Sequence, residues 1–383
     1  MNIKKDLKMK KFLLVISFLA VSLIKAENLS IITEEKELTL SLQEIDHLQA
    51  WCPWSSTPPK DVNPKPLSPF NVLELENNLR EKVIGQSQAV ENTANALLCY
   101  YAGINDPNKP IASFLYVGPT GVGKTELAKE LARQLFQDET KLLRFDMSEY
   151  ESQVGINRLI GVPNGYKDSE HGGLLSNAIL ANPHAVVLLD EIEKADPKVR
   201  ALFLHIFDEG YFTSGVGELV DCRNCVFIAT TNLASQAILN IHPFSYEKAL
   251  DTIEIYLINA LTPEFYNRIE PVIFQGLDRE MMKEIAQIKL NQLAQNILKQ
   301  KKVKVYFDEF VVDYIQTKGY HPALGARPMQ RLIKNELTPL IAKTILHAQY
   351  LPGDVMHISY LESELIISRL AESEANEILS TNP

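Results

Sequence analysis

Eight consecutive residues of this chain form a glycine-rich motif of the kind that binds phosphate groups. They are Gly118, Pro119, Thr120, Gly121, Val122, Gly123, Lys124 and Thr125. The spacing is that of G-x-x-x-x-G-K-[ST], in which backbone N–H groups curl around the phosphates and a helix N-terminus adds favourable partial charge. We expect Lys124 to reach the β- and γ-phosphates of ATP and the Thr125 hydroxyl to ligate Mg²⁺.

Two carboxylates follow an apolar run further along the chain. Residues 185–189 are apolar, and Asp190 and Glu191 come directly after them. A buried strand here would place both acids at its carboxyl end, beside the phosphates. We expect Asp190 to bind ATP by holding its Mg²⁺ through water, and Glu191 to polarise the attacking water. Together with the glycine-rich motif, this pair predicts hydrolysis as well as binding.

Strands and helices must alternate to position these groups. An apolar strand is predicted at residues 112–117, before the motif, and an amphipathic helix at 126–136, after it. Further short apolar runs occupy residues 142–145, 185–189 and 226–229. Strands interleaved with helices predict an α/β fold in which a parallel sheet lies between helices.

The character of the chain changes after Gly276. The helical periods at residues 278–300 and 328–348 predict a smaller, mainly helical second domain. We therefore expect a large domain over residues 71–275, a small C-terminal domain over 276–362 and a polar tail over 363–383.

The N-terminal segment has a composition of its own. Five lysines within the first eleven residues precede an apolar and serine-containing run at residues 12–24. Residues 1–26 fit a secretory signal peptide, with an uncleaved membrane anchor or an incidental apolar helix as alternatives. Residues 27–50 suggest a short helix, and six prolines between positions 51 and 70 predict an extended linker, so 27–70 is treated as one linking segment.

Charge and cysteine content limit the classes of partner. The formal net charge of −10 offers no general attraction for nucleic-acid phosphates, so no nucleic-acid partner is expected and a nucleic-acid motor is disfavoured. Cys222 and Cys225 have the spacing of half a zinc site, but no second Cys or His pair lies nearby at a suitable spacing. We expect them to be small buried residues.

Four segments resemble the Clp family of AAA+ ATPases, and most of all the second ATPase module of ClpB-type disaggregases. They lie at residues 83–86, 114–129, 145–150 and 189–196. The resemblance extends from about residue 73 to about residue 358. It implies an AAA+ large domain with a Clp-type small domain, and it implies that Val83 and Ile84 contact adenine.

The resemblance also supplies three further site residues. Asn232 matches the sensor that orients the attacking water, and Arg327 matches a second sensor that reports nucleotide state to the small domain. Arg268 matches the arginine finger, which stabilises charge on the γ-phosphate bound by the neighbouring subunit. Because a finger completes a neighbour's site, the resemblance implies a homo-oligomeric ring, with a hexamer expected.

Residues 165–168 (Gly-Tyr-Lys-Asp) stand where the family places its aromatic pore loop. Tyr166 could grip an extended polypeptide with its flat ring. The charged Lys167 and Asp168 leave a second interpretation open, in which the loop has lost threading and serves only in assembly.

These features predict an ATP-dependent unfoldase or disaggregase-type chaperone acting on unfolded or aggregated polypeptides. A torsin-like regulatory ATPase, which switches a partner without threading, is the alternative. Torsins lack the arginine finger and the pore aromatic, which this chain keeps as Arg268 and Tyr166. Protease-coupled members of the family carry a docking tripeptide of the type aliphatic-Gly-aliphatic/aromatic. Residues 235–261 contain no such tripeptide, so no ClpP-type peptidase partner is expected. The N-terminal segment favours export or a membrane tether, whereas the need for ATP favours the cytoplasm.

Overall fold

The computed structural model describes residues 29–33, 36–40, 72–152, 154–163, 172–347 and 350–370. Residues 1–62 and 63–383 form two separate units. In the first unit, β1 (Leu29–Thr33) pairs antiparallel with β2 (Lys36–Leu40). The short helix suggested for residues 27–50 is therefore wrong for this part, where the β-branched Ile31, Ile32 and Thr33 favour a strand. The predicted signal segment and the prolines of the linker lie outside the described residues.

The second unit contains a five-stranded parallel sheet. Its strands are β3 (Ala112–Val117), β4 (Leu142–Asp146), β5 (Val186–Asp190), β8 (Val226–Thr231) and β9 (Glu270–Ile273), in the order β4-β5-β8-β3-β9. Four of these strands coincide with predicted apolar runs. Sequence reasoning missed β9, which has four residues and includes Pro271 at the edge of the sheet.

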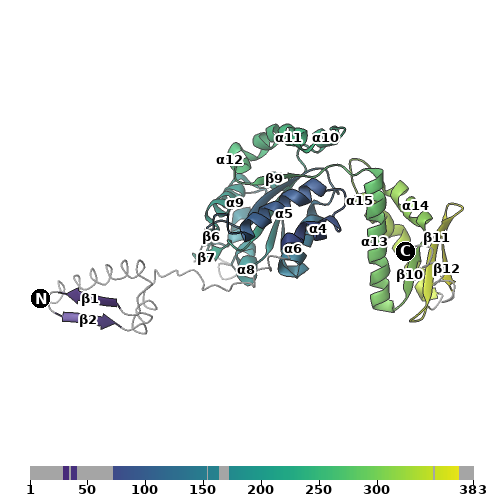
Figure 1. The fold of residues 1–383 in the computed structure, drawn as a ribbon, viewed down its shortest axis with the longest axis horizontal. Coiled ribbons are helices and arrows are strands. Elements are labelled where there is room, and N and C mark those ends of the chain that lie inside the picture. Colours follow the sequence, from purple (N-terminus) through teal and green to yellow (C-terminus); the bar gives the residue numbers. More distant parts are fainter. Residues whose placement is uncertain are drawn as a thin grey trace. The chain divides into compact units, whose positions relative to one another are not determined.

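Helices cover both faces of this sheet (Figure 1). Alternate residues of each strand point to opposite faces, so Leu188 and Ile228 pack in one apolar cluster and Val187 and Phe227 in the other. On the first face lie α5 (Ser87–Tyr101) and α6 (Lys124–Phe136), and on the second α9 (Pro197–Glu209) and α11 (Tyr246–Leu261). This burial on both faces explains the continuous apolar runs in the sequence.

The C-terminal region combines helices with a small sheet. Its helical elements are α13 (Arg279–Lys301), α14 (Glu309–Gly319), α15 (Arg327–Leu332), a π-helical turn (Ile333–Leu337) and α16 (Thr338–His347). A three-stranded sheet, in the order β10-β11-β12, is built from β10 (Lys304–Phe307), β11 (Val355–Leu361) and β12 (Glu364–Leu370). The polar tail predicted from residue 363 is wrong for β12, because this strand pairs along its whole length with β11.

The remaining elements are short and connect the layers. They are α4 (Leu75–Arg80), α7 (Gly155–Ile160), α8 (Leu174–Ala181), α10 (Ser235–Leu239), α12 (Pro263–Tyr266), β6 (Tyr211–Thr213), β7 (Leu219–Asp221) and 3₁₀ turns at Glu139–Lys141, Met147–Tyr150 and Ile192–Lys194. Within the described ranges, none of the helices has the length and apolar character needed to cross a bilayer.

Candidate nucleotide site

The glycine-rich motif forms the loop between β3 and α6, as predicted, and α6 begins at Lys124. Gly121 and Gly123 have φ values of +72° and +115°, which side-chain-bearing residues rarely adopt. Gly121 also lies against the C-terminal region, because a Cβ there would sit 2.5 Å from the carbonyl oxygen of Leu324. The Ala326 N–H donates to the Gly121 carbonyl at 2.9 Å. The loop is therefore tightly curled and in direct contact with the start of α15.

Lys124 is held inside this loop by oxygen acceptors. Its Nζ donates to the carbonyls of Gly118, Pro119 (3.1 Å) and Thr231 (3.0 Å), and to Oδ1 of Asn232 (2.8 Å). The side chain is buried, and this burial lowers the pKa of Lys124 to about 7, against the opposing effect of nearby carboxylates led by Glu193. A buried ammonium surrounded by carbonyl oxygens is well placed to exchange them for the more negative oxygens of a phosphate.

The two predicted carboxylates lie at the carboxyl end of β5. Asp190 accepts from the hydroxyl of Thr230 and lies 2.6 Å from the guanidinium of Arg144. Glu191 adopts the left-handed conformation, with φ of 58° and ψ of 53°, and its carboxylate lies 2.6 Å from Nζ of Lys194. Both acids are therefore paired with cations in this structure.

Asn232 connects the lysine of the phosphate loop to a carboxylate that follows β5. Its side chain accepts from Lys124, and its backbone N–H donates to Oε1 of Glu193 at 3.3 Å. The other oxygen of Glu193 is buried without a hydrogen-bond partner. Sequence reasoning did not single out Glu193, which nevertheless supports both Asn232 and the charge of Lys124.

These groups surround one cavity of about 470 Å³. The predicted residues that line it are Val83, Ile84, Thr120, Gly121, Val122, Gly123, Lys124, Thr125, Asp190, Glu191, Asn232 and Arg327. Gly118 and Pro119 lie beneath Lys124 and contribute carbonyl acceptors instead. The cavity thus brings together the phosphate loop, the end of β5, the predicted adenine contacts and the second sensor.

Part of the cavity wall was missed by sequence reasoning. Ile285, Ile288 and Lys289 of α13 line it together with Leu277. Lys289 lies 3.0 Å from Glu126, the residue after Thr125. The three α13 residues recur at helical spacing, which was the one available signal, but nothing local to α13 identifies the surface that it faces.

The donors available for Mg²⁺ are oxygens. The hydroxyl of Thr125 and the carboxylate of Asp190 line the same cavity, and hard oxygen donors suit this ion. Over the ranges given above, no three His, Cys, Asp or Glu side chains are grouped to hold a metal by themselves.

Arg268 does not line the cavity of its own chain. It follows α12, where Nε is paired with the carboxylate of Asp208 and Nη1 donates to the Glu264 carbonyl at 3.2 Å. Its side chain is 35% exposed. Tyr166 lies outside the described residues. Cys222 and Cys225 are buried as predicted, and burial raises the pKa of Cys225 to about 12.

Two protein families match consecutive parts of the chain. The AAA domain (Cdc48 subfamily) matches residues 109–272, and the C-terminal, D2-small domain of ClpB protein matches residues 277–358. The fold, the cavity and these matches define a Clp-type AAA+ ATPase module. Among such modules, the chain belongs with the second ATPase module of ClpB-type chaperones.

Individual relatives are named as ClpB chaperones. "Chaperone protein ClpB 2" of Nostoc sp. is 42% identical over 302 residues, which cover 78% of this chain and 34% of the relative. "Chaperone protein ClpB 1" of Parasynechococcus marenigrum is 41% identical over 300 residues, covering 78% and 35%. "Chaperone protein ClpB" of Prochlorococcus marinus is 37% identical over 340 residues, covering 88% and 39%. The chain therefore spans little more than a third of the length of these relatives.

Proposed function

We propose that this chain hydrolyses ATP to remodel polypeptides, as an unfoldase or disaggregase-type chaperone. The observation that carries the proposal is the convergence of Lys124, the Asp190–Glu191 pair, Asn232 and Arg327 on one cavity. Relatives named as ClpB chaperones support this function over a torsin-like switch.

Each side chain has a role that its position supports. Lys124 would leave its carbonyl partners and bind phosphate oxygens, which compensate the cost of its burial. Thr125 and, through water, Asp190 would hold Mg²⁺, which neutralises charge on the phosphates. Glu191 would release Lys194 and accept a proton from the attacking water, while Asn232 orients that water.

A hydrogen bond between backbone groups connects the phosphate loop to the segment that carries the second sensor. The Ala326–Gly121 hydrogen bond places Arg327, the next residue, at the cavity wall. A shift of the loop on nucleotide binding would therefore be passed directly to α15. This connection supports a role for the C-terminal region in converting nucleotide state into motion.

Completion of the site would require a neighbouring subunit. Arg268 lies away from its own cavity, partly exposed, with its Nε and Nη1 occupied by partners in the same chain. An arginine in this position fits a finger directed at an adjacent nucleotide. We therefore include a homo-oligomeric ring, with six subunits expected, in the proposal. The signal peptide, the membrane tether and the absence of a ClpP-type partner stay predictions.

The test is ATP turnover by the full chain, with and without an unfolded polypeptide. Glu191→Gln serves as the blank for hydrolysis, and Tyr166→Ala tests whether the ring of Tyr166 holds the polypeptide. Tyr256→Ala is the matched control, because Tyr256 is an exposed tyrosine of α11 away from the cavity. Stimulation by polypeptide that Tyr166→Ala removes and Tyr256→Ala preserves would support threading. Turnover indifferent to polypeptide would contradict threading, and no turnover above the Glu191→Gln blank would contradict an ATPase.

A further inference from the structure

A buried side-chain amide contacts the phosphate loop from outside the lining of the cavity. Gln86 precedes α5 and is 2% exposed. Although it occupies the N-cap position, its side chain makes no capping hydrogen bond to α5. It turns instead toward the phosphate loop and the end of β9, where it makes three hydrogen bonds.

Those hydrogen bonds join segments that are far apart in the sequence. The Nε2 group donates to the carbonyl of Val122 at 3.2 Å and to that of Gln275 at 3.1 Å. Its Oε1 accepts from the N–H of Gln275 at 3.0 Å. Both amide hydrogens and one oxygen lone pair are therefore used, which leaves the side chain a single well-defined orientation.

Gln275 returns the connection to the turn before α5. Its Nε2 donates to the carbonyl of Gly85 at 2.7 Å, so Gly85, Gln86 and Gln275 form a closed set of hydrogen bonds. The segment that carries Gln275 is itself anchored, because the Phe274 N–H donates to the carbonyl of Val117 at 2.8 Å. The turn and the phosphate loop are thus both held at the carboxyl ends of β3 and β9.

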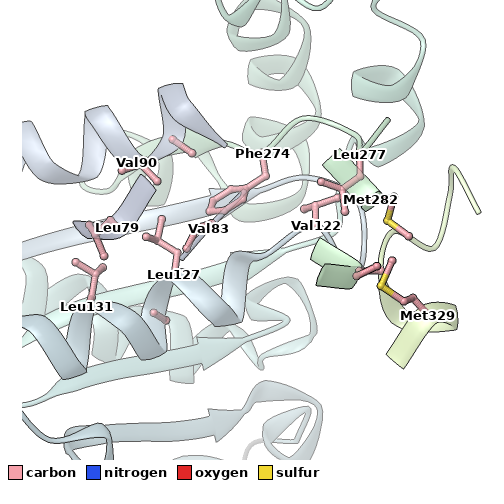
Figure 2. Close-up of a cluster of buried hydrophobic side chains, with 14 of the residues drawn as sticks. Leu79, Val83, Val90, Val122, Leu127, Leu131, Phe274, Leu277, Met282 and Met329 are labelled. Carbon is pink, nitrogen blue, oxygen red and sulfur yellow. The ribbon is translucent and has the colours of Figure 1, made fainter. Parts of the chain in front are cut away.

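The surroundings of this amide are apolar. Val83, Val122 and Phe274 belong to one buried cluster, and their side chains are among those drawn in Figure 2. A misplaced amide here would leave buried polar groups without partners, at a cost larger than the gain from a single bond. The geometry between turn and loop is therefore well determined.

We infer that Gln86 is a positioning residue. It sets the distance between the turn that would contact the base (residues 82–84) and the phosphate loop, so that the base and the phosphates of one nucleotide can be bound at the same time. Lys82, Val83 and Ile84 line the cavity from the turn, and Val122 lines it from the loop. Gln86 itself does not line the cavity, so it acts through these residues. The inference rests on the nucleotide-binding part of the proposed function.

Gln86→Met tests the inference, because methionine has a similar length and volume and removes all three hydrogen bonds. The matched control is Thr93→Val, which removes the buried hydrogen bond between Thr93 of α5 and Tyr116 of β3, 3.3 Å long, without touching the cavity. For the full chain we would measure the Kd of ADP by titration calorimetry, the KM and kcat for ATP, and the melting temperature without nucleotide.

We expect Gln86→Met to raise the Kd of ADP and the KM of ATP about tenfold and to keep kcat within about twofold, since the machinery for hydrolysis is intact. Thr93→Val should lower the melting temperature while leaving Kd and KM within about twofold. Equal changes in Kd for the two variants would overturn the inference, and so would a Gln86→Met variant that binds ADP as the unmodified chain does. Failure of the unmodified chain to bind ADP would instead overturn the proposed function.

Discussion

Nζ of Lys289 lies 3.0 Å from the carboxylate of Glu126, which connects α13 to the first turn of the phosphate-loop helix. Both residues line the cavity, and their side chains are 23% and 42% exposed. The pair therefore links the C-terminal region to the large domain at the wall of the cavity. Because it is partly exposed, its contribution to stability is small, and its position matters more than its strength.

Lys289→Glu should weaken nucleotide binding, because it breaks this ion pair and adds negative charge to the wall of the cavity. We expect the KM of ATP to rise about threefold to tenfold at low salt, with a smaller rise at high salt. Steady-state turnover at two ionic strengths measures this effect.

The exchange of both charges is the control. Lys289→Glu combined with Glu126→Lys restores the pair with opposite polarity and keeps the net charge of the cavity unchanged. Recovery of KM to within about twofold of the unmodified chain would assign the effect to the pair. A double variant as impaired as Lys289→Glu alone would show that the pair itself has no role.

The motifs of the site could be predicted from the sequence because each is contiguous. The phosphate loop needs eight neighbouring residues, and the Asp190–Glu191 pair needs only the apolar strand before it. Such local patterns fix both the residue types and the element that carries them. The alternation of strands and helices likewise predicted four of the five parallel strands.

The supports of the site could not be predicted, because long-range packing creates them. Glu126 and Lys289 are 163 positions apart, and Gln86 and Gln275 are 189 apart. No local pattern marks such a pair. The strand β12 was missed for a related reason: its residues alternate in burial, but only pairing with β11 distinguishes an edge strand from an exposed tail.

Arg268 and Asp208 should act as a unit if the arginine serves a neighbouring subunit. We expect Arg268→Ala to lower kcat about a hundredfold or more, as loss of an arginine finger does. Asp208→Asn should lower kcat about threefold to tenfold by releasing the guanidinium, and the double variant should be no worse than Arg268→Ala. An increase in kcat for Asp208→Asn would mean that the pair restrains the arginine instead of aiming it.

Mixing two inactive variants tests the action between subunits. In the proposed ring, Arg268→Ala and Glu191→Gln subunits would together form sites in which an intact Glu191 faces an intact Arg268 from the neighbour. Turnover should therefore return when the two proteins are mixed, although each alone is inactive. If the mixture stays inactive while mass measurements show mixed rings, Arg268 does not act in trans.

Gly121 should be sensitive to substitution, because two constraints meet there. Its φ of +72° disfavours any side chain, and a Cβ would lie 2.5 Å from the Leu324 carbonyl. Gly217, in the turn between β6 and β7, has a similar φ of +85°, but a Cβ there would have no atom within 4 Å, so this position isolates the backbone strain. We expect Gly217→Ala to lower the free energy of unfolding by about 1 kcal/mol and to leave ADP binding within about twofold.

Gly121→Ala should cost at least as much stability and also weaken ADP binding about tenfold or more. The added methyl group must displace the segment that carries Leu324, and with it the Ala326–Gly121 hydrogen bond and the approach of Arg327. Denaturant unfolding and calorimetry on the two variants separate strain from displacement. Equal ADP affinities would show that contact between the loop and the start of α15 is dispensable for binding.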